Sequence, residues 1–313
     1  MCSIIDVIDS LRISGIQILS FGEGKVQLSD SNLQEIQAAG LHLLNLFVEA
    51  CQKMELKYFL MGGTLLGAAR HRGYIPWDDD IDVGMLRSDF ESFKKEGQKY
   101  LPSYAFLQSE GAEPDYPHNF MKIRDSRTTL IETSVKHIPM NHGIYIDIFP
   151  VDYYPESRIA QKFFELQRKL LSIRIRDAFL LSDNYQPSFL SRMAYLLIKT
   201  LFPSISKALN RRGKLYSSVK QSELVANLCG IYGSREIVPY EWFSDVREVI
   251  FENGMYYAPY EYDKYLTHVY GDYMKLPPPE KRKSHHCVEM FDASKPYTQY
   301  LSVPLRERFL GLG

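Results

Sequence analysis

The sequence predicts an α/β (α+β) fold, in which a mixed-sheet core is interrupted by a helical insertion. Residues 80–85 alternate polar and apolar side chains, and residues 144–149 have isoleucine at every second position; both patterns have the period of two that is typical of strands. Residues 156–230 instead read as mostly helical, and the pattern of strands resumes after Val246. A chain of 313 residues is long enough for one large or two modest domains.

The bulk composition is that of an ordinary globular protein. Apolar residues make up 45% and charged residues 24%, and a net charge of −1 gives no overall attraction to nucleic acid. The four cysteines are scattered, which argues against a disulfide framework or a zinc module and favours a reducing compartment. The first residues carry Asp6 and Asp9 and no basic start, unlike a secretory signal. No apolar run reaches the ~18 residues that span a bilayer, so we expect a cytoplasmic protein.

The first predicted elements precede the most informative stretch. Residues 11–28 alternate apolar and polar side chains around Gly22 and Gly24, which predicts a small hairpin. Residues 29–31 offer capping side chains for a helix that extends to about Met54. That helix has a stripe of apolar residues for burial: Leu33, Ile36, Leu43, Leu44, Phe47, Val48 and Cys51.

A glycine pair follows the short apolar run of residues 58–61. Gly62 and Gly63 permit a tight turn and a close approach of the backbone to a ligand. Thr64 then suits the cap of a helix that runs to about His71.

Four carboxylates come next within five positions. Apolar residues at 81, 83 and 85 alternate with polar positions, so a strand here would hold Asp80 and Asp82 on one face. Such carboxylates repel each other, and one tends to stay protonated unless a cation neutralises the pair. They suit Mg²⁺ or Mn²⁺, with substrate phosphates completing the coordination. The alternative, a solvated acidic turn, does not require the apolar alternation. The four residues are Asp78, Asp79, Asp80 and Asp82.

Further alternating segments follow a helix predicted at residues 87–100. Residues 104–108 predict a strand, and residues 118–132 predict a strand pair joined by a turn. Lys122 and Arg124 have the same parity in this pair and therefore face one side. A solvated basic face is the simpler interpretation of these two residues.

Residues 143–152 form the second informative strand. Asp147 is a lone carboxylate in an apolar pattern, and an isolated buried charge is costly unless it is paired or binds a metal. A backbone group or an arginine as its partner is the alternative at this point.

The predicted insertion is strongly basic. Residues 156–220 contain thirteen basic and four acidic side chains, a net charge of +9, which leaves −10 for the rest of the chain. This asymmetry indicates an anionic partner for the insertion. Residues 189–202 are apolar nearly all round, interrupted by Arg192 and Lys199. They suit either a buried core helix or a helix that lies in a membrane surface beside the basic residues 207–214.

The C-terminal part predicts a hairpin and an aromatic cluster. Residues 246–251 and 255–258 suit two strands that turn at Asn253 and Gly254. Seven tyrosines crowd residues 256–273, most of them for packing, although a few could form an aromatic cage for a quaternary ammonium. Consecutive residues rarely ligate one ion, so the run of two histidines and Cys287 does not predict a metal site. One of these histidines, for which we select His285, is a candidate phosphate or base contact.

The run GGTLLGAARHRGYIPWDDDIDV resembles the signature of the LicD family of phosphocholine transferases, which are similar to fukutin and the fukutin-related protein. The KIRD element at 122–125 and the run YGDYMKLPPPEKR also resemble that family. The resemblance covers roughly residues 40–152 and, less closely, 255–290. It implies a nucleotidyltransferase-like catalytic core in residues 1–155, a helical, basic insertion in 156–243 and a return to the core in 244–313.

The resemblance also implies a reaction. Phosphocholine, or a similar phospho-alcohol, would pass from CDP-choline or another CDP-alcohol to a hydroxyl of a surface glycopolymer precursor such as teichoic acid, lipopolysaccharide or capsule, with release of CMP. The implied catalytic and metal-binding residues are Asp80, Asp82 and Asp147. The candidate nucleotide-binding residues are Gly62, Gly63, Thr64, Arg70, Lys122, Arg124 and His285.

Two other functions stay open from the sequence. One is a true nucleotidyltransferase that makes an NDP-linked product, and the other is a non-catalytic module that binds choline or glycan. The crowded carboxylates argue against the module, because without a metal their repulsion would serve no purpose. A lipid-linked glycan acceptor would bring the protein to the inner membrane face, with contact through residues 189–220. We expect no nucleic-acid partner.

Overall fold

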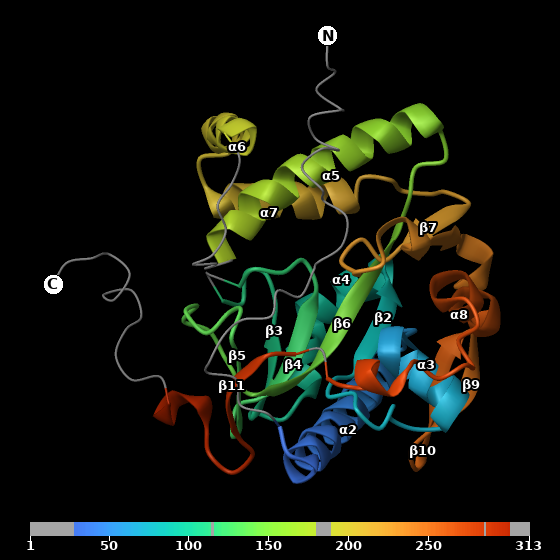
Figure 1. Ribbon diagram of the computed structural model, residues 1–313. Coiled ribbons are helices and arrows are strands. Elements are labelled where there is room, and N and C mark those ends of the chain that lie inside the picture. The colour runs from blue at the N-terminus through green and yellow to red at the C-terminus, as the bar shows by residue number, and fades with distance from the viewer. Residues whose placement is uncertain (1–27, 114–115, 180–188, 285, 301–313) are drawn as a thin grey trace, which may run out of the picture.

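A computed structural model of the chain describes residues 28–113, 116–179, 189–284 and 286–300 (Figure 1). Within these residues the core is a mixed sheet of seven strands, in the order β1-β2-β6-β4-β3, with β7 paired to β6 and β8 paired to β7. The prediction of a mixed α/β fold is confirmed. The hairpin predicted at residues 11–28 lies outside the described residues, apart from residue 28 itself.

The two strands at the centre of the sheet are β2 and β6, and their pairing is parallel. Each of the other pairings in the described sheet is antiparallel. Strand β6 is buried along nearly its whole length, since both of its faces are covered. The strands are β1 Phe59–Leu60, β2 Asp82–Leu86, β3 Ala105–Gln108, β4 Met121–Asp125, β6 Ile144–Tyr153, β7 Leu224–Ala226 and β8 Ile237–Pro239.

Helix α2, Asp30–Lys53, covers one face of the sheet together with α4, Arg87–Glu96 (Figure 1). The predicted cap is confirmed, because the Ser29 hydroxyl accepts the Asn32 N–H at 3.1 Å. The Phe47 and Phe93 rings of the two helices meet edge to face with centroids 5.0 Å apart. This packing buries the apolar side of β2 and β6, and therefore directs the polar side chains of both strands to the opposite face.

Three helices beyond one end of the sheet form a second layer, which we call the helical layer: α5 Arg158–Phe179, α6 Phe189–Leu201 and α7 Ile205–Tyr216 (Figure 1). Helices α5 and α7 share a separate small core that includes Leu171, Leu209 and Tyr216. Strands β7 and β8 follow this layer and rejoin the sheet through β6. No helix in the described residues is long and apolar enough to cross a membrane.

The interpretation of residues 189–202 as a buried core helix is wrong for most of α6. Met193, Leu196, Leu197 and Leu201 are all exposed, and Ile198 is buried. The physical reason is that α6 packs on the outside of α5, so among its described apolar side chains Ile198 faces the protein and the other four face outward.

The C-terminal segments return to the core. The predicted hairpin is confirmed as β9 Val246–Phe251 and β10 Gly254–Pro259, and helix α8 follows at Tyr262–Tyr270. The strand pair predicted in residues 118–132 is wrong. Strand β4 pairs with β3 and β6, whereas β5, Thr129–Glu132, pairs with β11, Val288–Asp292. Strand β4 is paired along both of its edges, with β3 and with β6, so neither edge is free for β5.

Short 3-10 helices complete the described chain. They are η1 Gly97–Tyr100, η2 Gly233–Glu236, η3 Tyr240–Trp242, η4 Pro279–Lys281 and η5 Tyr297–Gln299.

Candidate active site

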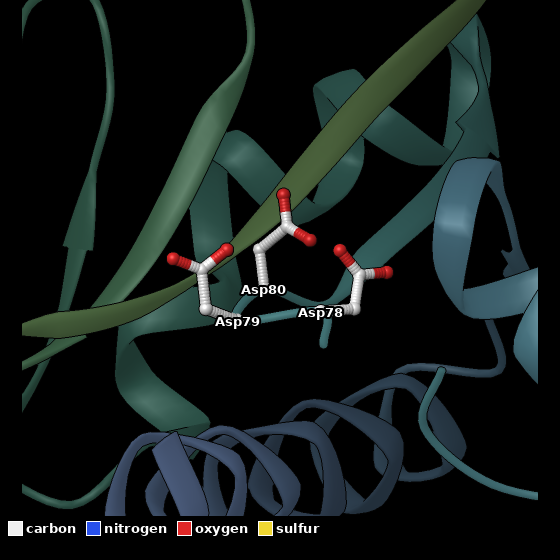
Figure 2. Close-up of side chains that lie close together, drawn as sticks. All are labelled: Asp78, Asp79 and Asp80. Atoms are coloured by element: carbon white, nitrogen blue, oxygen red, sulfur yellow. The ribbon is translucent and has the colours of Figure 1, made fainter. Parts of the chain in front are cut away.

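An acidic loop lies between helix α3, Gly62–His71, and strand β2. It holds Asp78, Asp79 and Asp80, each of which offers one carboxylate oxygen within 4.8 Å of the others. Figure 2 shows their carboxyl groups on the same side of the loop, directed away from helix α2. Carboxylate oxygens are the ligands that hard divalent cations prefer, so this triad could hold a metal ion.

The sequence predicted that Asp80 and Asp82 lie on one strand, but in the structure they do not. Strand β2 begins at Asp82, because pairing with β6 starts only where the Asp147 N–H donates to the Ile81 carbonyl at 2.8 Å. A turn closed by the Asp78 N–H and the Ile75 carbonyl shapes the loop before it. Asp82 is instead the register partner of Asp147 on β6. The two carboxylates therefore lie side by side on neighbouring strands, next to the acidic loop.

The glycine pair leaves space for two of these carboxylates. Gly62 has a φ of +53°, and a Cβ atom there would lie well inside 3.0 Å of the Asp82 carboxylate. At Gly63 a Cβ atom would lie 2.5 Å from Asp78 Oδ2. The missing side chains allow the carboxylates to approach the first turn of α3, where backbone N–H groups and the helix dipole favour negative charge.

Thr64 does not cap α3. The helix begins at Gly62 with Met61 as its N-cap residue, because Met61 is the last residue with an extended backbone. The Thr64 side chain is already inside the first turn and faces β2, where its hydroxyl accepts the Asp82 N–H at 2.8 Å. Thr64 therefore fixes the start of the strand that carries Asp82.

Lys122 of β4 is the register partner of Asp147 on β6 and forms an ion pair with it. Its Nζ lies 2.8 Å from Asp147 Oδ1 and 3.3 Å from the centroid of the Tyr145 ring. The side chain is almost fully buried, so this ion pair is poorly screened by water. Glu132 Oε2 lies farther from the ammonium, at 4.0 Å.

Arg124 shares the face of Lys122, as its parity predicted, but it lies deeper in the sheet. Its Nε donates to Gln108 Oε1 at 2.6 Å and its Nη1 donates to the Gly143 carbonyl at 2.8 Å. The guanidinium is fully buried. These bonds join β3, β4 and the start of β6, so the observed contacts of Arg124 hold the sheet together.

The carboxylates strongly influence one another. Burial raises the pKa of Asp82 well above its usual value, and the neighbouring carboxylates Asp80, Asp147 and Asp78 raise it further. Burial also raises the pKa of Asp147, against the opposing effect of Lys122. Such a concentration of buried carboxylates is costly without a cation. The chemistry of this donor set, carboxylate oxygens gathered at one place, fits a divalent metal ion.

His286 contacts the acidic loop from the C-terminal part of the chain. Its Nδ1 lies 2.9 Å from Asp79 Oδ1, its Nε2 lies 3.8 Å from Asp80 Oδ2, and Ser284 Oγ donates to Asp79 Oδ2 at 2.6 Å. Burial lowers the pKa of His286, but Asp79 and Asp80 outweigh that effect and raise it well above its usual value. His285, which the sequence analysis selected, lies outside the described residues.

Arg70 lies at the end of α3 and contacts another C-terminal segment. Its Nη1 donates to the Tyr273 carbonyl at 2.8 Å, and its Nε lies 3.0 Å from His71 Nε2. Glu236, which was not predicted from the sequence, is a buried carboxylate that accepts the Tyr265 hydroxyl at 3.1 Å. Asp78, Asp79, Ser284, His286 and Glu132 were not selected either. The acidic run and the histidine pair were visible signals for most of them, but their spacing did not distinguish one neighbour from the next.

Comparisons with known proteins identify similar chains. A family model described as LicD/FKTN/FKRP, nucleotidyltransferase domain, matches residues 55–182. The chain is 30% identical over 267 residues to the lipopolysaccharide cholinephosphotransferase LicD of Haemophilus influenzae, which covers 83% of this chain and 97% of that protein. It is 29% identical over 111 residues to the human ribitol 5-phosphate transferase FKRP, which covers 34% of this chain and 19% of that protein. The matched family region contains the glycine pair, the acidic loop and strands β2, β4 and β6.

Proposed function

This chain belongs to the LicD/FKTN/FKRP family of transferases, and from that membership we propose that it transfers phosphocholine, or a similar phospho-alcohol, from a CDP-linked donor to a hydroxyl of a cell-surface glycopolymer precursor. The bond between the phosphorus that carries the alcohol and the bridging oxygen of the CMP group breaks. A bond from the acceptor oxygen to the same phosphorus forms, and CMP leaves. The name of the Haemophilus influenzae relative, which matches nearly along its whole length, supports choline as the alcohol and lipopolysaccharide as the acceptor class.

One observation carries the proposal. Asp82 and Asp147 are register partners on β2 and β6, next to the loop carboxylates, and the Lys122 ammonium lies 2.8 Å from Asp147. A site of this kind combines a place for a divalent cation with a fixed positive charge. Phosphoryl transfer depends mostly on positioning and on neutralising the charge of the phosphate groups, which is what such residues supply.

We assign the metal to Asp80, Asp82 and Asp147, with Mg²⁺ or Mn²⁺ as the ion. The loop triad of Asp78, Asp79 and Asp80 is the other candidate set, and Asp80 belongs to both. Bound at either set, the ion would offset the negative charge of the donor diphosphate during in-line transfer. Asp80 suits a ligand role in both arrangements. It belongs to the triad, and its carboxylate is close enough to Asp82 to raise the pKa of that group.

The remaining side chains have roles that follow from their contacts. Lys122 neutralises charge on the transferred phosphate, and Asp147 completes the metal site or accepts the proton of the acceptor hydroxyl. The first turn of α3, at Gly62 and Gly63, presents backbone N–H groups to the diphosphate. Thr64 keeps Asp82 in place through its bond to the strand backbone.

A cleft of about 370 Å³ between α4, the start of β4 and α7 is our candidate for the acceptor site. It is lined by Lys94 and Lys214, and also by Phe120, whose ring centroid lies 5.5 Å from Lys122 Nζ. This contact links the cleft to the ion pair at Asp147. Lysines beside an aromatic ring suit a glycan that bears phosphate groups. Lys214→Ala should therefore raise the KM for the acceptor and leave donor affinity unchanged.

The test is the product that the protein releases. CMP should appear when the purified protein is incubated with Mg²⁺, CDP-choline and an acceptor glycan, and phosphocholine should appear on the glycan. CDP-ribitol and CDP-glycerol serve as parallel donors, since the FKRP relative is named for ribitol 5-phosphate. Release of pyrophosphate from CTP, without CMP from any CDP-alcohol, would identify a nucleotidyltransferase instead. A choline-dependent rise in melting temperature with no product at all would identify a binding module.

A further inference from the structure

Helix α6 presents an apolar stripe to the outside of the protein. Met193, Leu196, Leu197 and Leu201 are between 51% and 62% exposed, although their spacing of three and four residues places them on one side of the helix. Ile198, at 3% exposed, is the described apolar residue of α6 that faces inward. Large apolar side chains that gather on one exposed face mark an interaction surface more often than isolated ones do.

Two hydrogen bonds attach the end of α6 to α5. The Arg174 guanidinium on α5 donates to the Phe202 carbonyl at 2.8 Å and to the Pro203 carbonyl at 3.1 Å. Arg174 is itself buried, so it ties the end of α6 to the small core that α5 shares with α7. Figure 1 shows α6 on the far side of α7 from the sheet.

Helix α5 repeats the pattern. Ile159 and Phe163 are 69% and 64% exposed and lie one turn apart, and Lys162 beside them is exposed as well. They lie opposite the side of α5 that contributes Phe164 and Leu171 to the small core. The helical layer is therefore apolar on outer faces of two helices.

Basic side chains adjoin the end of α6. Only three residues separate α6 from α7, and Lys207 and Arg211 lie one turn apart on the exposed side of α7. The whole segment 156–220 carries a net charge of +9. Arg212 is different, because its Nε donates to Asn119 and its guanidinium lies near the Tyr216 ring. Lys207 and Arg211 are both exposed, so their charge is available to an outside partner.

We propose that α6, together with Lys207 and Arg211 of α7, docks the protein on the surface of an anionic lipid bilayer. An apolar stripe with basic residues beside it is the pattern of a helix that lies in the interfacial plane, with its apolar side in the boundary between headgroups and acyl chains. Charge complementarity favours a lipid surface of negative potential. At 13 residues, α6 is about 20 Å long and so lies along the surface.

The experiment is sedimentation of the full chain with vesicles. Wild-type protein should sediment with vesicles that contain phosphatidylglycerol and stay in solution with pure phosphatidylcholine. Binding should weaken as the ionic strength rises from about 0.01 M to about 0.1 M, because the Debye length falls from ~30 Å to ~10 Å. Wild-type protein that ignores anionic vesicles at low salt would overturn the proposal.

Matched variants separate the two parts of the surface. Leu196→Ser with Leu197→Ser should reduce partitioning by about tenfold or more, since both lose apolar area that enters the bilayer. Lys207→Gln with Arg211→Gln should reduce it roughly 30-fold, at about fivefold for each basic residue near an anionic surface. The controls are Met255→Ser on β10 and Lys53→Gln with Lys95→Gln, which are exposed to a similar degree away from the helical layer.

Two further measurements separate a lipid surface from a second copy of the chain, and docking from transfer activity. Sedimentation velocity reports self-association: if wild-type protein forms a dimer that the Leu196→Ser and Leu197→Ser changes dissociate, and vesicles do not compete, the stripe is a contact between two copies and the proposal is overturned. CMP release in solution is measured on every variant. Loss of vesicle binding with unchanged CMP release supports docking, whatever the donor alcohol is. Variants that bind vesicles as well as wild type does would also refute it.

Discussion

The glycine at the start of α3 offers the sharpest test of the carboxylate arrangement. Gly62→Ala introduces a methyl group where the structure leaves no room, well inside 3.0 Å of the Asp82 carboxylate. The φ of +53° at this position also costs an alanine about 1 kcal/mol. The backbone of Asp82 is fixed by its bond to Thr64 and by its pairing with β6. We therefore expect the Asp82 carboxylate to move, by roughly 1 Å, to reach an ordinary contact distance.

Gly233→Ala is a matched control for this change. Gly233 has nearly the same positive φ, +59°, but nothing lies within 4 Å of the position of its Cβ. Both variants should lose about 1 kcal/mol in the free energy of unfolding, because both place alanine in the left-handed region. Only Gly62→Ala should also disturb the site. A displacement of about 1 Å in a catalytic group costs on the order of 10²-fold in rate.

Two measurements complete this test. Chemical unfolding compares the stabilities of the two variants, and calorimetric titration with Mg²⁺ together with CMP release compares their sites. Gly62→Ala should bind the metal more weakly than Gly233→Ala and turn over about 10²-fold more slowly. If the two variants had the same metal affinity and the same rate, the Asp82 carboxylate would not be part of the working site, and our assignment would be wrong.

Three other predictions concern single carboxylates. Asp80→Asn or Asp82→Asn should abolish metal binding and transfer. The melting temperature of the metal-free protein should hold or rise, because burial and like charges already raise the pKa of both groups. Full activity with an unchanged metal titration would refute the assignment. Asp147→Asn should lower turnover by roughly 10² to 10⁴-fold, and more than it lowers donor affinity; normal turnover at saturating donor would make Asp147 a binding residue only. Burial raises the pKa of Glu236 from 4.5 to about 7, so the folded protein binds more protons than the unfolded chain between these values. The free energy of unfolding should consequently fall by roughly 3 kcal/mol as the pH rises through this window. Urea unfolding at several pH values measures this fall, and the Glu236→Gln variant should not show it.

Features with a local cause could be predicted from the sequence. Helix α2 begins after Ser29 because a serine side chain can satisfy a free backbone N–H within its own turn. The β9–β10 hairpin turns at a short polar segment with a glycine, and its two strands are neighbours in the chain. The alternation around Asp147 likewise predicted a strand with a single acid on one face, because side chains of a strand alternate regardless of the partner.

Features that depend on distant segments were decided by the tertiary structure. The pairing of β5 with β11 could not be predicted from the residues of β5. More than 150 residues lie between the two strands, and pairing with β4 would have satisfied the same backbone groups. The pairing of His286 with Asp79 is equally remote in the chain. The histidine pair indicated that one ring could reach a site, but only the path of the C-terminal segment determines which one does.

The active site combines both kinds of information. The residue pattern was enough to predict that carboxylates crowd together after a glycine pair, and that one more carboxylate lies in an apolar strand. The register that makes Asp82 and Asp147 partners could not be predicted in this way, because it depends on the packing of α2 and α4 against the apolar side of both strands. The same holds for α6, whose sequence suits burial and exposure alike. The exposure of its described apolar side chains, Ile198 excepted, follows from the position of α6 outside α5.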